Sequence, residues 1–242
     1  MTVFFIGAGP GDPELITVKG QRLVCTCPVI LYAGSIVPSA VLEGHCAEQV
    51  INTAELDLDA IVALLEAAHA KGQDVARIHS GDPSLYGAIG EQIRRLRQLG
   101  IPYEIVPGVT ATAACAATLG CELTLPNVSQ TLILTRYATK TSMPEGEQFA
   151  DLARHRATMA IHLGVRHLAR IVDELRPHYG GTCPIAVVYR ASWPDEEEIT
   201  GTLDDIVGKI QSMQIEHTAL ILVGEVLAAE GFADSTLYAK NA

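Results

Sequence analysis

The chain has 242 residues, 48% of them hydrophobic, which is enough apolar surface for one large or two small folded domains. No run approaches the roughly 20 uninterrupted apolar residues of a membrane-spanning helix, so we expect a soluble protein without membrane contacts. Lys and Arg number 17 against 28 Asp and Glu, a formal net charge of −11 that argues against a nucleic-acid binder but leaves room for a local basic pocket.

The N-terminus reaches an apolar run, Val3 to Ile6, almost at once and has no basic region, which predicts a first strand rather than a signal peptide. The six cysteines include no Cys-x-x-Cys pair and no histidine at a zinc-finger spacing. We therefore expect reduced, buried thiols in a cytoplasmic protein. Cys115 and Cys121, which lie among small and apolar residues, are expected to fill space in the core.

The first strand leads into a glycine-rich loop, Gly7 to Pro13, and then into a helical pattern from Leu15 to Leu23. An α/β protein binds ligands at such a place, outside the carboxyl end of a strand. However, the third glycine comes one residue too early for a dinucleotide fingerprint, and Pro10 and Pro13 have no N–H to offer a pyrophosphate. The loop predicts a nucleoside-type ligand without phosphates; a tight turn with no ligand is the alternative.

The rest of the first half alternates apolar runs with helical patterns, which predicts a parallel α/β sheet. Strands are expected at residues 28–32, 75–78 and 103–106, with a possible edge strand at 48–52. Helices are expected from Leu58 to a stop at Lys71-Gly72, at 88–99 and at 110–119.

A pause in this alternation near Thr124 to Asn127 predicts a domain boundary. It separates an N-terminal α/β domain, residues 1–124, from a C-terminal α/β domain with a mixed sheet, residues 129–242. In the second domain we expect strands at 131–135, 158–163, 184–189, 197–201 and 219–223, and helices after residue 146, at 165–175 and at 202–213.

Several of the expected strands end in loops rich in glycine, proline or polar residues. Strand ends of a parallel sheet lie on one edge, so these loops are expected to converge on a crevice, and two such domains would form a cleft. The loops are residues 7–13, 79–87, 107–112, 135–137, 163–164, 189–192 and 223–225.

Three side chains of the 79–87 loop are candidates for chemistry. The Asp82 carboxylate could orient a substrate N–H or favour a cation, or it could simply cap the following helix. His79 could move a proton near neutral pH, although a hydrogen-bonded histidine at a strand end is the more common situation. Tyr86 could stack on a flat ligand or only pack against its neighbours.

Positive charge is scarce, so Arg136, Lys140 and Arg190, at or just beyond strand ends, are candidate carboxylate ligands or else ordinary surface charges. The acidic run from Asp195 to Glu198 is expected to be a solvated loop. No Ser/His/Asp order, Walker loop or metal cluster is recognisable in the sequence. Such a chain suits a reaction in which an activated cofactor and an electron-rich substrate need alignment more than a strong base.

Three motifs resemble the tetrapyrrole (corrin/porphyrin) methyltransferase family, and the resemblance covers nearly the whole chain. They are Phe5 to Gly20, with its Gly-Ala-Gly-Pro-Gly-Asp-Pro loop, Gly81 to Gly87 (Gly-Asp-Pro-Ser-Leu-Tyr-Gly) and Val106 to Thr110 (Val-Pro-Gly-Val-Thr). The resemblance implies two α/β domains with a ligand cleft between them, S-adenosylmethionine bound in that cleft, and a homodimer. Leu31 to Ser35 and Gly81 to Ala88 look most like the branch that acts on corrin precursors of cobalamin.

The resemblance also implies roles for individual residues, those of the second half resting on looser motifs. Asp82 would help position substrate or cofactor, and His79, Arg136 and Lys140 would contact the carboxylate-rich tetrapyrrole, with no metal site. Residues implied to approach the cofactor are Pro10, Gly81, Asp82, Leu85, Tyr86, Thr110, Ala111, Leu163, Tyr189 and Arg190.

The implied reaction is a direct displacement, in which an electron-rich ring carbon attacks the sulfonium methyl group and S-adenosylhomocysteine is the product. Whether the substrate is metal-free or contains cobalt, and which ring carbon is methylated, stay open. A non-catalytic tetrapyrrole- or nucleotide-binding module is the alternative from another class. A nicotinamide-dependent oxidoreductase is disfavoured by the spacing of the glycines.

Overall fold

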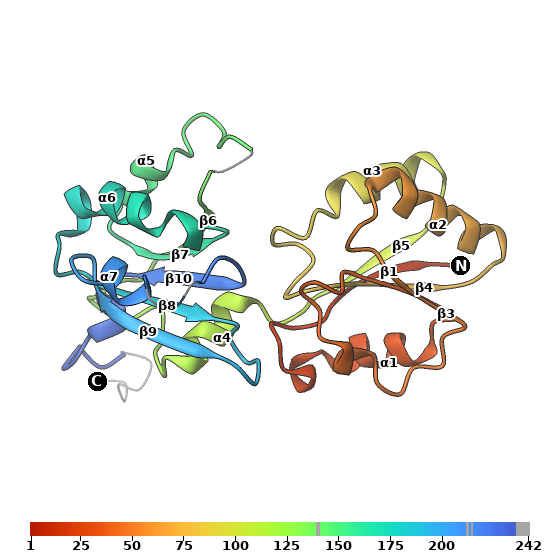
Figure 1. The fold of residues 1–242 in the computed structure, drawn as a ribbon, viewed down its shortest axis with the longest axis horizontal. Coiled ribbons are helices and arrows are strands. Elements are labelled where there is room, and N and C mark those ends of the chain that lie inside the picture. The colour runs from red at the N-terminus through yellow and green to blue at the C-terminus, as the bar shows by residue number, and fades with distance from the viewer. Residues whose placement is uncertain (139–140, 212, 214, 236–242) are drawn as a thin grey trace, which may run out of the picture. The chain divides into compact units, whose positions relative to one another are not determined.

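The computed structural model describes residues 1–138, 141–211, 213 and 215–235, and its ribbon is drawn in Figure 1. The chain divides into two compact units, Met1–Ala111 and Thr112–Ala242. Each unit contains one five-stranded sheet with helices, so the prediction of two α/β parts is confirmed. The domain limits predicted at residues 124 and 129 stay a prediction. Among the described residues, no helix has the length and apolar character needed to cross a membrane.

The sheet of the first unit is entirely parallel, in the order β3-β2-β4-β1-β5. Because β1 and β4 are neighbours and β1 also pairs with β5, the loops that follow these three strands start side by side at one edge. The strands are β1 (Val3–Gly7), β2 (Val29–Tyr32), β3 (Gln49–Asn52), β4 (Val75–His79) and β5 (Tyr103–Val106).

Helices cover both faces of this sheet, with α2 (Leu58–Ala70) and α3 (Gly90–Gln98) on one face and α1 (Val18–Thr26) on the other (Figure 1). Alternate residues of each strand point to opposite faces, so Phe5 packs under α2 and α3 while Ile6 packs in the cluster that includes α1. The helix expected from Leu15 begins only at Val18, because the Thr17 side chain accepts the Gly20 N–H and caps it there.

The sheet of the second unit is mixed, as predicted, in the order β6-β7-β10-β8-β9. Only β6 and β7 pair in parallel; β10 runs antiparallel to both β7 and β8. The end of β10, at residues 223–225, therefore lies at the opposite edge from the ends of β6, β7 and β8, and the expectation that it joins their loops is wrong. The strands are β6 (Leu132–Arg136), β7 (Thr158–His162), β8 (Pro184–Tyr189), β9 (Glu197–Thr202) and β10 (Ala219–Val223).

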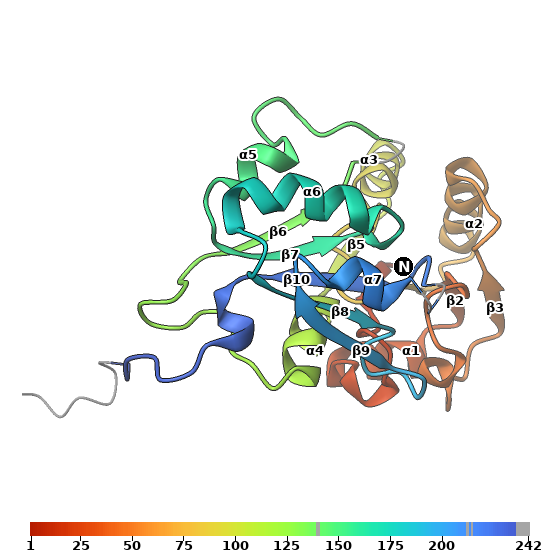
Figure 2. The same ribbon diagram turned by 60° about the vertical axis from the view of Figure 1, so that its left-hand side comes forward.

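Helix α4 (Ala111–Thr118) covers one face of the second sheet, and α5 (Phe149–Ala153) and α6 (Leu168–Tyr179) cover the other (Figure 2). The small residues of α4 allow close packing on the strands, and Cys115 is fully buried there, as predicted. Cys121 is only half-buried and Cys46 is exposed, so the expectation that every thiol is buried is wrong.

The helix expected at 202–213 is limited to α7 (Ile206–Ile210). Strand β9 continues to Thr202, whose N–H donates to the Asp205 carboxylate at 2.8 Å and forms a turn before the helix starts.

Candidate functional site

Three glycine loops of the first unit are packed against one another at the ends of β1, β4 and β5. The Gly81 N–H donates to the Gly9 carbonyl at 2.7 Å, and the Gly9 N–H donates back to the Gly81 carbonyl at 3.3 Å. A Cβ atom on Gly7 would lie 2.6 Å from the Gly108 Cα, and one on Gly108 would lie 2.2 Å from the Gly81 oxygen. The sequence suggested that the glycines of the 7–13 loop bring the backbone close to a ligand. In the structure, Gly7 and Gly9 bring it into contact with the two neighbouring loops.

The Asp82 carboxylate links two of these loops. One oxygen accepts the Gly108 N–H at 2.9 Å, and the other accepts the Ser84 N–H at 2.8 Å and the Ser84 hydroxyl. Burial raises the pKa of Asp82, but these hydrogen bonds lower it by more, so the net pKa is below the usual range. Asp82 is therefore ionised at neutral pH and is a poor proton acceptor. Its hydrogen bonds to Ser84 cap the following turn, which is one of the two roles that the sequence offered for it.

Tyr86 stands in a strained turn that follows Asp82. Its φ is 56° and that of Ala88 is 50°, so two residues other than glycine adopt the left-handed region. Between them, a Cβ on Gly87 would lie 2.3 Å from the Pro83 oxygen. The Tyr86 side chain is 45% exposed, so much of its surface is available to a ligand. Backbone strain of this kind is common at functional sites.

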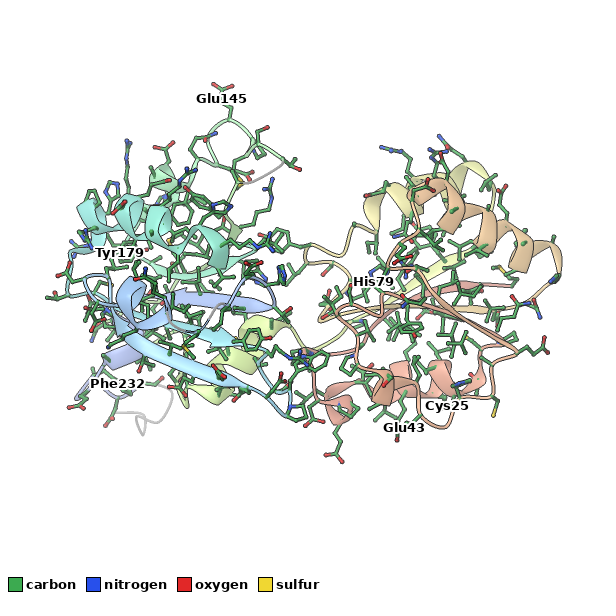
Figure 3. The ribbon with its side chains drawn as sticks, viewed as in Figure 1. Cys25, Glu43, His79, Glu145, Tyr179 and Phe232 are labelled. Atoms are coloured by element: carbon green, nitrogen blue, oxygen red, sulfur yellow. The ribbon has the colours of Figure 1, made fainter. Side chains whose placement is uncertain are left out.

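His79, at the end of β4, is buried and contacts the Gly87 backbone of this turn; its side chain is labelled in Figure 3. Burial lowers the pKa of His79, as does the neighbouring Arg77 charge, and a contact with the Gly87 backbone offsets only part of this, leaving a value of about 3. The ring is 5.8 Å from the Phe5 ring, and its Nε2 has no hydrogen-bond partner in the part of the chain that the structure describes. The imidazole is neutral near pH 7, which argues against the proton-transfer role; its contact with a substrate stays a prediction.

Other residues implied to approach the cofactor lie in these loops or directly after them. Pro10 is buried directly after Gly9, Leu85 is half-buried and donates its N–H to the Asp82 carbonyl at 3.2 Å, and Thr110 and Ala111 are half-buried where α4 begins. The structure thus brings the residues predicted from the first half of the chain to one edge of the first sheet.

In the second unit, Leu163, Thr218 and Arg190 form a row at one sheet edge. They follow β7, precede β10 and follow β8, three strands adjacent in the sheet. Their φ values are 55°, 55° and 48°, all left-handed, and the Arg190 N–H donates to the Thr218 carbonyl at 2.8 Å. Leu163 is 65% exposed, so most of its side chain faces solvent.

Thr218 was not predicted as a site residue. A β-branched residue with φ above zero is a genuine outlier, yet nothing in the local sequence signals it. It also lines a pocket of about 270 Å³ together with Tyr189. The other lining residues are Glu197, Met213, Ile215, Glu216 and His217.

Arg136 and His162 lie opposite each other at the ends of β6 and β7. The Arg136 guanidinium donates to the backbone carbonyls of Thr141 and Ser142, each at 3.0 Å, so it is already engaged. His162, which the sequence did not single out, has its Nε2 3.2 Å from the Thr112 hydroxyl of α4, and burial lowers its pKa to about 4. Lys140 lies outside the described residues.

Within the described ranges, no group of three or more His, Cys, Asp or Glu side chains could hold a metal ion.

Comparisons with known proteins match nearly the whole chain. The family model described as tetrapyrrole (corrin/porphyrin) methylases matches residues 2–207. A precorrin-4 C(11)-methyltransferase from Pseudomonas aeruginosa is 76% identical over 98% of this chain and 95% of its own length. A cobalt-precorrin-4 C(11)-methyltransferase from Methanocaldococcus jannaschii is 49% identical over 99% of this chain and 93% of its own.

Solved structures show the same similarity. The crystal structure of a cobalt precorrin-4 methyltransferase has a TM-score of 0.91 and 39% identity, covering 94% of this chain and 96% of that chain. A uroporphyrin-III C-methyltransferase from Thermus thermophilus, complexed with S-adenosylhomocysteine, has a TM-score of 0.78 and 31% identity, with 94% of each chain covered.

Proposed function

Because the chain belongs to the tetrapyrrole (corrin/porphyrin) methylases, we propose that it is an S-adenosylmethionine-dependent methyltransferase that converts precorrin-4 to precorrin-5 by methylation at C11, in cobalamin biosynthesis. The observation that carries this proposal is the high identity to the P. aeruginosa relative over nearly the full length of both chains. At that level of identity the fold is shared, and the substrate is expected to be shared as well.

The glycine loops of the first unit fit a nucleoside-type cofactor that lacks phosphates. The N–H groups of Gly9 and Gly81 already donate to each other's carbonyls, and Pro10 has no N–H, so these residues offer no cradle for a phosphate. S-adenosylmethionine, when bound, supplies a methyl group on a positively charged sulfur. The residues proposed to hold it are Pro10, Gly81, Asp82, Leu85, Tyr86, Thr110 and Ala111 in the first unit, and Leu163, Tyr189 and Arg190 in the second.

The protein's own contribution is alignment of the two reactants and exclusion of water. Asp82 is central to this because its ionised carboxylate fixes the Ser84 turn and the Gly108 loop in one arrangement. No residue of the site has to remove a proton before the methyl transfer, which agrees with the low pKa of Asp82 and with a neutral, buried His79.

We further propose that His79, Arg136 and Lys140 contact the macrocycle and that the two cations bind its carboxylates. Arg136 is oriented by the carbonyls of Thr141 and Ser142, so a substrate carboxylate would have to compete with them or add to them. Arg136→Ala is expected to raise the KM for the macrocycle while the Kd for S-adenosylhomocysteine is unchanged. Equal weakening of both would contradict this assignment.

A second candidate substrate is cobalt-precorrin-4. It is favoured by the M. jannaschii relative and by the cobalt precorrin-4 methyltransferase structure, both of which have that substrate in their names. We also propose that the protein is a homodimer, as the family resemblance implies, and that it is located in the cytoplasm, as the cysteine pattern suggests. Light scattering on the purified protein tests the dimer.

The deciding experiment supplies the purified protein with ¹³C-methyl-labelled S-adenosylmethionine and either precorrin-4 or its cobalt form. Carbon NMR of the product then identifies the methylated ring position. Transfer to C11, with one S-adenosylhomocysteine formed for each methyl group, is the expected result. Transfer to another carbon would identify a sibling enzyme, and binding of S-adenosylhomocysteine without any turnover would favour a non-catalytic binding module.

A further inference from the structure

The loop that joins β8 to β9 holds an arginine in a fixed orientation. The guanidinium carbon of Arg190 lies 4.0 Å from the centre of the Trp193 ring, and Trp193 is the single tryptophan of the chain. At that distance the guanidinium is in direct contact with the ring. The Tyr189 ring, whose centre is 5.9 Å away, is a second aromatic neighbour of the same group.

Asp195 fixes one edge of the same guanidinium. Its carboxylate oxygen lies 2.9 Å from the Arg190 Nε. The Nε atom is covered by its neighbours and makes no well-aligned hydrogen bond, so this contact is an ion pair. The side chain as a whole is 29% exposed, which means that solvent reaches its other atoms. Among the residues described, the terminal nitrogens of Arg190 make no hydrogen bond or ion pair that would occupy them.

The backbone of this loop is strained and is held by hydrogen bonds. Arg190 and Ser192 have φ values of 48° and 66°, a strained conformation for residues other than glycine. The Glu196 carboxylate accepts the Ser192 N–H and also the Thr118 hydroxyl of α4, at 3.1 Å, so the loop is tied to a helix. These hydrogen bonds therefore hold the strained backbone in place, and with it the Cα atom from which the Arg190 side chain extends.

We propose that Arg190 is the binding residue of a carboxylate-recognition site and that Trp193 and Asp195 are positioning residues that act through it. A planar guanidinium with its terminal nitrogens available matches a carboxylate by two parallel hydrogen bonds. Stacking on Trp193 and pairing at Nε hold that plane before a ligand arrives, which lowers the entropy lost on binding. This inference rests on the proposed function, because both reactants of that reaction carry carboxylates.

The carboxylate has two possible sources, the acid side chains of the macrocycle and the amino-acid end of the methyl donor. Arg190→Lys keeps the charge but loses the planar pair of donors, so it distinguishes the sources by which ligand it weakens. If the macrocycle is bound, its KM rises roughly tenfold and the Kd for S-adenosylhomocysteine is unchanged. If the methyl donor is bound, S-adenosylhomocysteine weakens while methylthioadenosine, which has no carboxylate, binds as before.

Either of these results supports the site. The site is overturned if the KM for the macrocycle and the Kd values for S-adenosylhomocysteine and methylthioadenosine are all unchanged. It is also overturned if the binding of S-adenosylhomocysteine and methylthioadenosine is weakened equally. The wild-type protein separates this inference from the proposed function. If the wild type does not methylate the macrocycle, the proposed function fails, whereas if it does and the variant is unaltered, only the carboxylate site fails.

The positioning role of Trp193 is tested by a double-mutant cycle. Trp193→Leu is expected to weaken the same ligand as Arg190→Lys, and Trp193→Phe to restore most of the affinity because a ring face is kept. In the Arg190→Lys background, Trp193→Leu should add little, since it acts through the guanidinium. Fully additive losses, or a loss that follows the melting temperature and is not rescued by phenylalanine, would show a merely structural role.

Asp195 has a matched control in the same acidic run. Asp195→Asn and Glu198→Gln each remove one negative charge from the run, but only Asp195 contacts Arg190. We expect Asp195→Asn to weaken carboxylate binding relative to Glu198→Gln, because it alone releases the guanidinium edge. Identical effects of the two substitutions would mean that Asp195 contributes charge and not position.

Discussion

Asp82 illustrates how a residue that is reactive in principle can serve the site by its hydrogen bonds. Both of its oxygens are occupied by N–H groups of the chain, one from its own turn and one from the loop after β5. A carboxylate held in this way is a poor base, but its hydrogen bonds link the two loops firmly. We propose that its contribution to the reaction is to hold the Gly108 loop against the Gly81 loop, where the cofactor is proposed to bind.

Asp82→Ala is therefore expected to weaken S-adenosylhomocysteine binding about tenfold and to lower the free energy of unfolding by about 1–2 kcal/mol, since two N–H donors lose their acceptor. Calorimetric titration and denaturant unfolding measure the two effects. Ser84→Ala is the control, because it removes only the hydroxyl contact and leaves both N–H bonds in place. If both variants bind S-adenosylhomocysteine like the wild type, Asp82 does not organise the cofactor site.

The buried histidines give the fold a defined pH dependence. Burial lowers the pKa of His79 from 6.5 to about 3 and that of His162 from 6.5 to about 4. Between these values and 6.5 the unfolded chain binds protons that the folded chain does not, so stability falls as the pH decreases through this window.

Each histidine is expected to destabilise the fold by up to about 1.4 kcal/mol per pH unit below its unfolded pKa. Denaturant unfolding of the wild type at pH 7 and pH 5, compared with His79→Gln, measures the contribution of His79. The variant should lose part of the pH dependence. A slope identical to that of the wild type would show that His79 is protonated in the folded state, contrary to its buried position.

At the scale of elements, the close contact of the three loops depends on glycine at residues 7 and 108, where a Cβ atom would clash with the neighbouring backbone. Gly108→Ala would place a Cβ 2.2 Å from the Gly81 oxygen, so the loops must separate. We expect a loss of about 3 kcal/mol in the free energy of unfolding and weaker S-adenosylhomocysteine binding. Gly90→Ala in α3 is the control, because a Cβ there meets nothing within 4 Å among the described atoms and alanine favours a helix. Comparable stability of the two variants would exclude the predicted clash.

The sequence was sufficient to predict the strands and most helices, because their apolar periodicity is local. The direction of β10 is not local: its residues are equally suited to a parallel or an antiparallel partner, and only the pairing with β7 and β8 decides it. For that reason residues 223–225 were assigned to the wrong edge and Thr218 was missed. The shorter α7 has a similar origin, since β9 pairing extends to Thr202.

The candidate site was predictable to a similar extent. Gly81, Asp82 and Tyr86 could be proposed as site residues because their motif is contiguous in sequence, and the structure adds the backbone conformation and hydrogen bonds of that loop. The row formed by Leu163, Thr218 and Arg190 could not be derived from spacing, because it depends on three strands that are far apart along the chain. Likewise, the contact of Arg190 with Trp193 occurs where the backbone of Arg190 is left-handed, and nothing in the local sequence indicates that conformation.

For the whole molecule, charge is the dominant property. A chain with a formal charge of −11 is expected to repel a polycarboxylate substrate at long range, while the local cations proposed above would attract it at short range. Salt screens this long-range repulsion more strongly than it screens the short-range attraction to local cations. We expect kcat/KM for the macrocycle to rise about two- to threefold between low and physiological ionic strength. Initial rates in a sodium chloride series measure this, and a steep fall with salt would show that the local cations dominate association.

The position of Trp193 gives the molecule an intrinsic optical reporter. As the single tryptophan, it accounts for all tryptophan fluorescence of the chain, and its ring is covered by the guanidinium proposed to bind a carboxylate. A ligand that draws Arg190 away or changes its hydration should alter the emission, and a bound tetrapyrrole, which absorbs light near the emission band, should quench it. Stopped-flow fluorescence can therefore follow ligand arrival at this loop in real time, without a label or a substitution.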